Sequence, residues 1–288
     1  MEPGILQHHP RSWQLARELW QFPRRGAIMG ILNVTPDSFS DGGLHDSLPA
    51  AIVHARELVA QGADIIDVGG ESTRPGSAEV AVEEELRRTQ PVIAALRAEF
   101  PKLRLSIDTR HAEVARAALL AGADVVNDIT GLADAEMRRV CAEMPCGVVI
   151  MHMQGTPETM QKAPHYDDVV AEVRDFFTAR VALAVASGIA PERICLDPGI
   201  GFGKTTGHNL ALIRNLESLR VQNLPMLMAL SRKRFLGEIL GDSTLPRENP
   251  LPTVVMSLQA AARGADMHRV HDVAPLRHAL TLNAALEE

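Results

Sequence analysis

Four side chains able to hold a flat, nitrogen-rich ring follow four short apolar segments of the chain. They are two carboxylates, one amide and one ammonium: Asp108, Asp197, Asn127 and Lys233. Carboxylates accept hydrogen bonds from ring and exocyclic N–H groups, whereas an amide and an ammonium donate to a ring oxygen or nitrogen. Brought together, these groups suit a heterocycle with amide-like and amidine-like edges.

An anion site is indicated near the C-terminus. Arg269 and His271 are separated by one residue in "RVHDV", so on a strand their side chains point to the same side and could hold a phosphate. By contrast, residues 197–206, "DPGIGFGKTT", are not a Walker loop, since Pro198 stands where that loop requires glycine. We interpret them as a bare strand-to-helix turn that lets a ligand approach the backbone.

Two aspartates also have structural interpretations. Asp108 is followed by Thr109 and a helical pattern, so it could cap that helix. Asp67, between two apolar residues, is interpreted as a structural residue that hydrogen-bonds to the neighbouring loop. A structural interpretation explains single aspartates, but it explains poorly a set of carboxylates, amide and lysine that follow four different strands.

A metal site has little support in the sequence. No HExxH motif or paired cysteine occurs, and His152 is surrounded by methionine and glutamine instead of other metal ligands. A metal, if used, should be Mg²⁺ held by oxygen ligands such as Asn33 and the phosphates of a substrate.

A long polar segment follows the first apolar run. About 15 residues separate Asn33 from the helical pattern near Pro49, whereas strand-to-helix connections usually take about 2 to 6. Long loops in compact domains are usually functional. Phe39, within "NVTPDSFSDGG", is therefore predicted to close over a ligand instead of packing in the core.

The elements that would position these residues alternate regularly. Eight short apolar segments, from "AIMGILN" to "DMHRVHD", alternate with stretches whose apolar residues recur at three- and four-residue spacing. Three of the segments are preceded by the same short motif, Gly-Ala-Asp, in "QGADIIDV", "AGADVVND" and "RGADMHRV". The glycines of this motif, Gly62, Gly122 and Gly264, are predicted to end the preceding helices. Residues 24–288 are therefore predicted to form a single-domain (β/α)8 TIM barrel, in which active sites lie at the C-terminal ends of the strands.

Residues 1–23 precede the barrel as a short N-terminal extension. In "SWQLARELWQF" the residues Trp13, Ala16 and Trp20 fall on one helical stripe, which predicts a helix that covers the bottom of the barrel. The alternative is a frayed terminus.

Composition argues against several classes of protein. The formal net charge of -7 disfavours nucleic acid, which usually selects a basic surface. No run of about 18 apolar residues and no secretory signal occur, so we expect a cytoplasmic protein without a membrane span. The three cysteines lack paired spacing and are expected to be buried, reduced thiols.

Eight motifs occur in order between Gly30 and Val273: "NVTPDSFSDGG", "DVGGESTRPGS", "LSIDT", "VNDITG", "MHMQGTP", "DPGIGFGK", "SRKRFLG" and "RVHDV". In order and spacing they resemble those of dihydropteroate synthase. That family joins 6-hydroxymethyl-7,8-dihydropterin pyrophosphate to p-aminobenzoate, releasing pyrophosphate and forming 7,8-dihydropteroate for folate synthesis. The resemblance implies this activity, Mg²⁺ as cofactor, a homodimer and sulfonamides as inhibitors.

The resemblance also implies roles for individual residues. The pterin pocket would consist of Asp108, Asn127, Met151, Asp197, Phe202 and Lys233. Pyrophosphate would contact Asn33, Thr73, Arg74, Arg269 and His271, with Asn33 also a ligand of Mg²⁺. p-Aminobenzoate would lie against Phe39, Pro75, Lys233 and Arg234, and the catalytic residues would be Asp41, Arg74 and Lys233.

The implied reaction is a dissociative (SN1-like) displacement, in which Asp41 faces the cation formed as pyrophosphate departs. The sequence supplies charge stabilisation but no Ser-His-Asp or Cys-His nucleophile. Two positions depart from the family, because Ala229 replaces a glycine of many members and Arg234 a serine of some.

The rival interpretations are a catalytically silent pterin-binding paralogue and a pterin-dependent corrinoid methyltransferase. A silent paralogue would have little reason to keep the two polar loops, residues 34–48 and 71–80, together with Arg269 and His271. A methyltransferase handles no leaving pyrophosphate, so the "RVHDV" and "SRKRFLG" motifs also favour the synthase.

Overall fold

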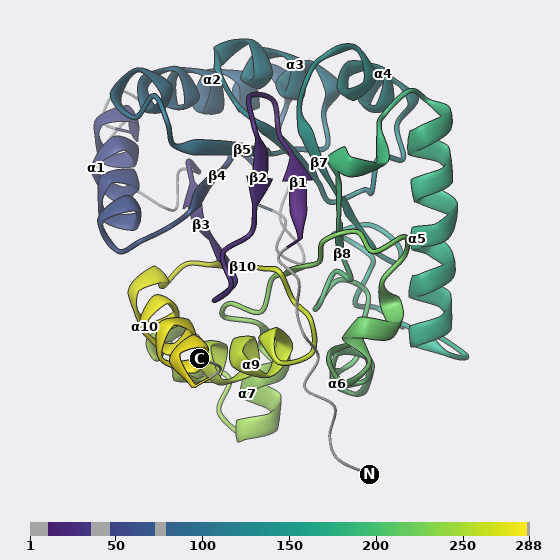
Figure 1. Cartoon of the computed structure of the whole chain (residues 1–288). Coiled ribbons are helices and arrows are strands. Elements are labelled where there is room, and N and C mark those ends of the chain that lie inside the picture. The colour runs from purple at the N-terminus through teal and green to yellow at the C-terminus, as the bar shows by residue number, and fades with distance from the viewer. Residues whose placement is uncertain (1–10, 36–46, 73–78, 287–288) are drawn as a thin grey trace.

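Eight parallel strands form a barrel surrounded by helices (Figure 1). The computed structural model describes residues 11–35, 47–72 and 79–286. The barrel strands are β3 (Ala27–Asn33), β4 (Ile65–Gly69), β5 (Arg104–Asp108), β6 (Val125–Asp128), β7 (Gly147–Met151), β8 (Ile194–Asp197), β9 (Leu227–Met228) and β10 (Met267–Val270). They pair in the order β8-β7-β6-β5-β4-β3-β10-β9, and a bridge between Leu196 and Met226 joins β8 to the segment that enters β9. The predicted (β/α)8 barrel is confirmed.

Each barrel strand is followed by at least one helix. The helices are α1 (Ser47–Ala60), α2 (Val82–Glu99), α3 (Ala112–Ala121), α4 (Ala135–Glu143), α5 (Val169–Ala186), α6 (Thr206–Arg214), α7 (Arg234–Leu240), α8 (Leu245–Glu248), α9 (Leu251–Ala261) and α10 (Val273–Ala285). Short 3-10 helices, Pro191–Arg193 and Leu216–Leu219, precede β8 and β9. Gly62, Gly122 and Gly264 have φ of 97°, 113° and 98°, so the predicted left-handed helix ends are confirmed.

The N-terminal segment is a β-hairpin, so the prediction of a helix there is wrong. Strands β1 (Ser12–Gln14) and β2 (Leu19–Gln21) are antiparallel, and Trp13 pairs with Trp20 across them. Residues that face one another across a hairpin point to the same side, which places both indoles on one apolar face without a helix. The spacing of the two tryptophans fits either structure.

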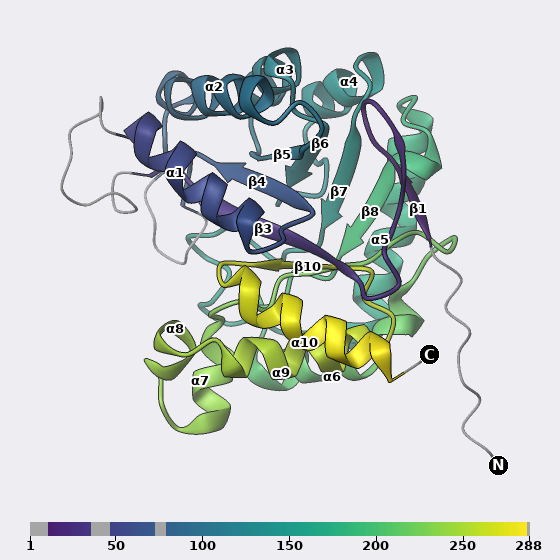
Figure 2. The same ribbon diagram turned by 60° about the vertical axis from the view of Figure 1, so that its left-hand side comes forward.

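The hairpin covers the end of the barrel at which the strands begin (Figure 2). Trp13 is fully buried, and its Nε1 donates to the carbonyl oxygen of Arg193 at 2.8 Å. Gly147 opens β7 directly under this ring, since a Cβ there would lie 3.0 Å from the indole. The hairpin packs on inward-facing side chains of the barrel: Ala27, Met29, Ile65, Val125, Val149, Cys195, Leu227 and Met267.

Toward the other end, the inward-facing positions become polar. The inward-facing residues just described on β4, β6, β8 and β10 are apolar. The next inward-facing residue on each of these strands, two positions later, is polar: Asp67, Asn127, Asp197 and Arg269. The apolar lower layer, sealed by the hairpin, therefore supports a polar upper layer at the mouth of the barrel. Cys141, Cys146 and Cys195 are free and buried, as expected.

Candidate active site at the barrel mouth

Arg269 stands at the centre of the polar layer. Its Nε lies 2.6 Å from Asp67 Oδ2 and its Nη2 lies 2.6 Å from Asp108 Oδ2. The two bonds come from two nitrogens of one guanidinium and fix its plane across the barrel. A side chain predicted to bind pyrophosphate is therefore in direct contact with one predicted to bind pterin.

Asp67 belongs to this site, which corrects the interpretation that it bonds to a neighbouring loop. Its Oδ2 accepts from both Arg269 Nε and Asn127 Nδ2, the latter at 3.1 Å. Because Nδ2 of Asn127 points to Asp67, the orientation of this amide is set. Asp67 is fully buried, and its Oδ1 has no hydrogen-bond partner among the described residues.

Asp108 ends β5 and carries a perturbed carboxyl group. Burial raises the pKa of Asp108 to about 7, while the charge of Arg269 opposes this shift and Asp67 adds to it. A carboxyl group whose pKa lies near neutrality changes its charge within the working range of most enzymes. Such groups cluster at functional sites.

Asp197 ends β8, on the far side of the mouth. The backbone N–H of Gly199 donates to Asp197 Oδ1 at 2.7 Å, so the turn after the strand fixes this carboxylate. Burial raises the pKa of Asp197, whereas the Gly199 hydrogen bond and the charge of Lys233 lower it. The second oxygen remains to accept from a ligand.

Lys233 approaches from the segment between β9 and α7. Its Nζ lies 4.2 Å from the centroid of the Phe202 ring, in a cation–π contact. Burial lowers the pKa of Lys233 to about 8, and the carboxylates of Asp197 and Asp108 oppose that shift. Asp108, Asn127, Asp197 and Lys233 thus come from four strands to one mouth, and Met151 ends β7 in the same layer.

Asn33 lies beside Asp108 at the rim. A Cβ on Gly69 would be 3.6 Å from Asn33 Oδ1 and 3.6 Å from Asp108 Oδ2, so the absence of a side chain at Gly69 leaves space between these oxygens. The described part of the chain contains no group of three His, Cys, Asp or Glu side chains able to hold a metal ion. Asn33 therefore fits Mg²⁺ only if a substrate brings most of the oxygen ligands, as Mg²⁺ bound to phosphates does.

His271 lies after β10, away from the two carboxylates that hold Arg269. Its Nδ1 is 3.0 Å from Ser231 Oγ. With His54, Arg232 and Asp272, the His271 side chain lines a hollow of about 300 Å³ between α1 and the start of α10. Arg269 is thus held by the buried carboxylates of Asp67 and Asp108, whereas His271 contacts Ser231.

Several predicted residues do not join this geometry. Arg234 begins α7 with 75% of its side chain exposed and is paired with Glu238 at 3.0 Å. Five predicted positions lie outside the described residues: Phe39, Asp41, Thr73, Arg74 and Pro75. On either side of positions 73–78, Glu71 and Glu79 contact the same guanidinium, that of Arg110, at 3.0 and 2.8 Å.

Sequence reasoning missed one residue beside the site. Lys204 was assigned no role, yet its side chain is buried against His152 and the turn that carries Asp197. Its signal in the sequence is a lysine at the end of a glycine-rich turn, a pattern more typical of a phosphate loop than of a buried donor.

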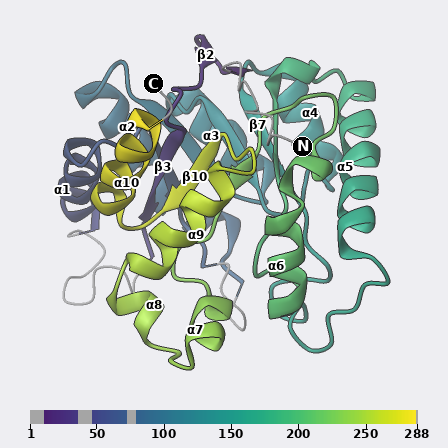
Figure 3. The same cartoon turned by 60° about the horizontal axis from the view of Figure 1, so that its bottom comes forward.

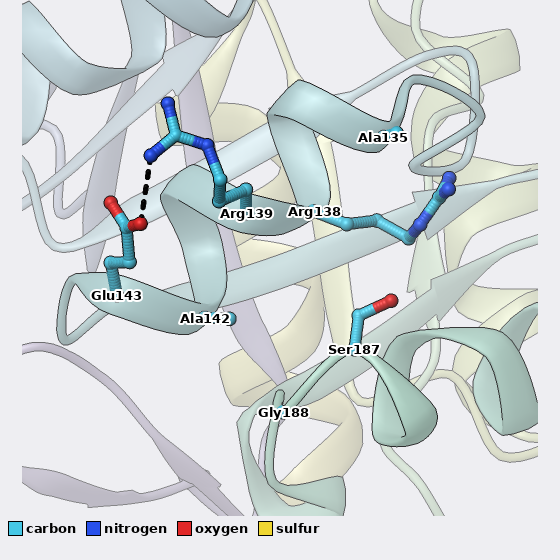
Figure 4. Close-up of a pocket in the computed structure, with 7 residues that line it drawn as sticks. All are labelled: Ala135, Arg138, Arg139, Ala142, Glu143, Ser187 and Gly188. Atoms are coloured by element: carbon cyan, nitrogen blue, oxygen red, sulfur yellow. Dashed lines mark hydrogen bonds and ion pairs between the residues drawn. The ribbon is translucent and has the colours of Figure 1, made fainter.

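A second hollow lies between helices on the outside of the barrel. It measures about 480 Å³ and is formed by α4 and the end of α5 (Figure 4). Its cations are already engaged, because Arg138 donates to two backbone carbonyls and Arg139 pairs with Glu136 and Glu143. This hollow lacks the convergent polar groups of the mouth.

Comparison with known proteins assigns the chain to a family. Residues 29–271 match the model of the "Pterin binding enzyme" family. A dihydropteroate synthase of Synechocystis sp. is 48% identical over 270 residues, which cover 93% of both proteins. The chain belongs to the dihydropteroate synthase family.

Solved structures of family members agree with this assignment. A dihydropteroate synthase of Xanthomonas albilineans, solved with 4-aminobenzoic acid, superimposes with a TM-score of 0.90 at 46% identity and covers 97% of this chain and 99% of its own. The Burkholderia cenocepacia dihydropteroate synthase, complexed with 7,8-dihydropteroate, gives 0.86 at 41% identity and 96% and 97% coverage. The family fold thus extends over the whole barrel.

Proposed function

We propose that this protein condenses 6-hydroxymethyl-7,8-dihydropterin pyrophosphate with p-aminobenzoate, yielding 7,8-dihydropteroate and pyrophosphate. The observation that carries the proposal is the convergence of Asp108, Asn127, Asp197 and Lys233 on one barrel mouth in a chain of this family. Relatives that share the fold were solved with 4-aminobenzoic acid and with 7,8-dihydropteroate.

The pterin is held edge-on by the polar layer. Asp197 and Asp108 accept from its N–H groups, while the amide of Asn127, oriented by Asp67, pairs with the edge between them. Lys233 donates to the ring oxygen or nitrogen on its side. Met151 and Phe202 supply the apolar walls.

The chemical step is a dissociative displacement. The bond between the pterin methylene carbon and the pyrophosphate oxygen breaks, and its electron pair leaves with pyrophosphate. The aniline nitrogen of p-aminobenzoate then attacks the methylene carbon and loses its proton to solvent. Asp41 faces the cation formed at that carbon, and Arg74 and Lys233 complete the catalytic set.

Leaving-group charge is balanced by basic residues at the rim. Arg269, His271 and Arg74, with the Thr73 backbone, hold the pyrophosphate, and Asn33 contributes an oxygen ligand to Mg²⁺. Bound Mg²⁺ supplies electrostatic stabilisation of the departing pyrophosphate. Phe39, Pro75, Lys233 and Arg234 form the p-aminobenzoate site, which sulfonamides would occupy as analogues.

The proposal includes a homodimer in the cytoplasm. Its support is an apolar face on α9, where Leu251 and Val255 are 59% and 46% exposed, beside α7 and α8 (Figure 3). No helix in the described ranges is long and apolar enough to span a bilayer. Sedimentation of the wild-type chain and of a Val255→Glu variant measures the dimer: a monomeric wild type would contradict it.

The activity is tested with purified protein, the pterin pyrophosphate, p-aminobenzoate and Mg²⁺. Pyrophosphate release and 7,8-dihydropteroate are both measured, with and without p-aminobenzoate. We expect product only with all substrates present. Pterin binding without product would instead support the silent pterin-binding paralogue.

A further inference from the structure

The ammonium of Lys204 is buried beside the pterin site. Only 2% of the residue is exposed, although it lies in the turn between β8 and α6. Its Nζ is 2.9 Å from the Phe202 carbonyl oxygen, 3.0 Å from that of Gly199 and 2.9 Å from His152 Nδ1. The His152 carbonyl oxygen is a fourth, more distant acceptor at 3.4 Å, so the three N–H donors of the ammonium are surrounded by acceptors.

His152 can act as an acceptor here only in one tautomer. With Lys204 donating to Nδ1, the imidazole is neutral and carries its proton on Nε2. Burial lowers the pKa of His152 to about 3, and the charge of Lys204 adds to this shift. The ring is also held by an edge-on contact with Phe176, at 4.8 Å between ring centroids.

The acceptors that Lys204 gathers belong to the segments that form the site. The Gly199 N–H fixes the carboxylate of Asp197, and the Phe202 ring lies against Lys233. The backbone N–H of His152 donates to the Asp197 carbonyl at 2.9 Å. A shift of this turn would therefore move a hydrogen-bonding group and an apolar wall of the pterin pocket together.

The packing of the turn brings backbone carbonyl groups of two segments to Lys204. Gly199 has φ of +64°, and a Cβ there would lie 1.9 Å from the carbonyl oxygen of His152. The two backbones thus meet at a distance that allows no side chain between them, with carbonyl oxygens from both facing Lys204. The Gly199 carbonyl oxygen also accepts from the backbone N–H of Phe202 at 3.0 Å. Without the ammonium, the Phe202 carbonyl oxygen and His152 Nδ1 would therefore lose the donor that they have among the described residues.

We propose that Lys204 is a positioning residue of the pterin site. Its ammonium holds the Gly199 and Phe202 carbonyl groups close to His152, and this fixes the positions of the Asp197 carboxylate and the Phe202 ring. This inference rests on the proposed pterin-binding function. Burial lowers the pKa of Lys204 to about 7, and the nearby Asp197 carboxylate favours its charged form. Lys204 acts through its neighbours and does not contact the substrate.

The first test is Lys204→Met, which keeps the apolar stem and removes every donor. Lys162→Met, at an exposed lysine, is the matched control. We expect Lys204→Met to bind a pyrophosphate-free 6-hydroxymethyl dihydropterin about 10- to 100-fold more weakly by calorimetry, the loss typical of one or two unpaired buried groups. The KM for the pterin substrate should rise in parallel, while the KM for p-aminobenzoate stays within about twofold of wild type.

A purely structural lysine would behave differently. It would lower the melting temperature of Lys204→Met but leave the pterin affinity of the folded protein unchanged, and that result would overturn the proposal. In Lys204→Ala, added methylammonium or ethylammonium should restore part of the pterin affinity. The same amines should leave wild type and Lys162→Met unaffected.

A measurement on the wild-type protein covers the case in which these variants do not fold. Nitrogen-15 chemical shifts of the His152 ring report its tautomer. A proton on Nε2 supports donation by Lys204, whereas a proton on Nδ1 would overturn it. A wild-type protein that binds no pterin would contradict both this inference and the proposed function; wild-type turnover with unchanged pterin affinity in Lys204→Met would contradict this inference alone.

Discussion

Arg269 Nη2 lies 2.6 Å from Asp108 Oδ2, so a predicted anion ligand is ion-paired with a predicted pterin ligand. In the proposed binding mode, a pterin N–H that reaches Asp108 would compete with this guanidinium, whereas pyrophosphate would attract it. Asp67, which accepts from Nε of the same guanidinium, is fully buried. The two halves of the pterin pyrophosphate would therefore act on one ion-pair network.

The first prediction separates Arg269 from His271. His271→Ala should weaken binding of the pterin pyrophosphate and leave a pyrophosphate-free pterin nearly unaffected, because His271 lies apart from the carboxylates. Arg269→Ala should weaken both ligands and lower the free energy of unfolding by about 3 to 5 kcal/mol, since it leaves buried carboxylates unpaired. Calorimetry and urea unfolding measure the two effects. Equal losses for both ligands in His271→Ala would place that residue in the pterin site instead.

The second prediction concerns Asp197. Asp197→Asn replaces an acceptor by a donor against the N–H edge of the pterin, so affinity should fall by about 2 to 3 kcal/mol. The exposed residue Asp175 on α5 provides the matched control, Asp175→Asn. Pterin titrations that give the same affinity for both variants would remove Asp197 from the site.

The third prediction concerns the hairpin. Trp13→Ala should lower the free energy of unfolding by about 3 to 5 kcal/mol, because it empties a fully buried site under the barrel. Leu19→Ala, at a side chain that is 52% exposed, should change it by less than about 0.5 kcal/mol. Pterin affinity of the folded fraction should be unchanged in both. A loss of affinity in Trp13→Ala would mean that the hairpin also shapes the mouth.

The sequence was sufficient for the barrel because each parallel strand is covered on both faces. Such strands are mainly buried and rich in apolar residues, and the predicted segments "AIMGILN" and "RLSID" coincide with β3 and β5. The two tryptophans of the hairpin also fit one helical stripe, so their spacing predicts a helix where the structure has two strands. Trp13 and Leu15, like Trp20 and Phe22, alternate at a period of two, and this was the signal for strands.

For the site, sequence order gave the strand ends but not the contacts between them. Asp67 and Arg269 are 202 positions apart, and only closure of the barrel brings them within 2.6 Å. Lys204 pairs mainly with backbone carbonyls and a ring nitrogen, which carry no sequence pattern. The strand-end residues of the mouth are therefore easier to predict from the sequence than the contacts that hold them in place.

The last prediction concerns the ionisation of Asp108 as the pH rises. Ionisation should strengthen pterin binding but lower the free energy of unfolding. Burial raises the pKa of Asp108 to about 7 in the folded protein, from an ordinary value of 3.8. To accept from a pterin N–H, the carboxyl group must be ionised, so pterin affinity should fall as the pH decreases through about 7, by at most about tenfold per pH unit for one proton.

Stability should change in the other direction. Between pH 4 and pH 7 the folded protein holds the Asp108 proton and the unfolded chain does not, so this group makes the free energy of unfolding fall as the pH rises. The Asp108→Asn variant lacks the titrating group, and both pH dependences should be shallower in it than in wild type. Subtracting the two profiles removes the contributions of Asp128 and Asp197, whose pKa values burial also raises. Calorimetric titrations and urea unfolding between pH 5 and pH 8 measure both profiles; parallel profiles for wild type and variant would show that Asp108 titrates outside this range.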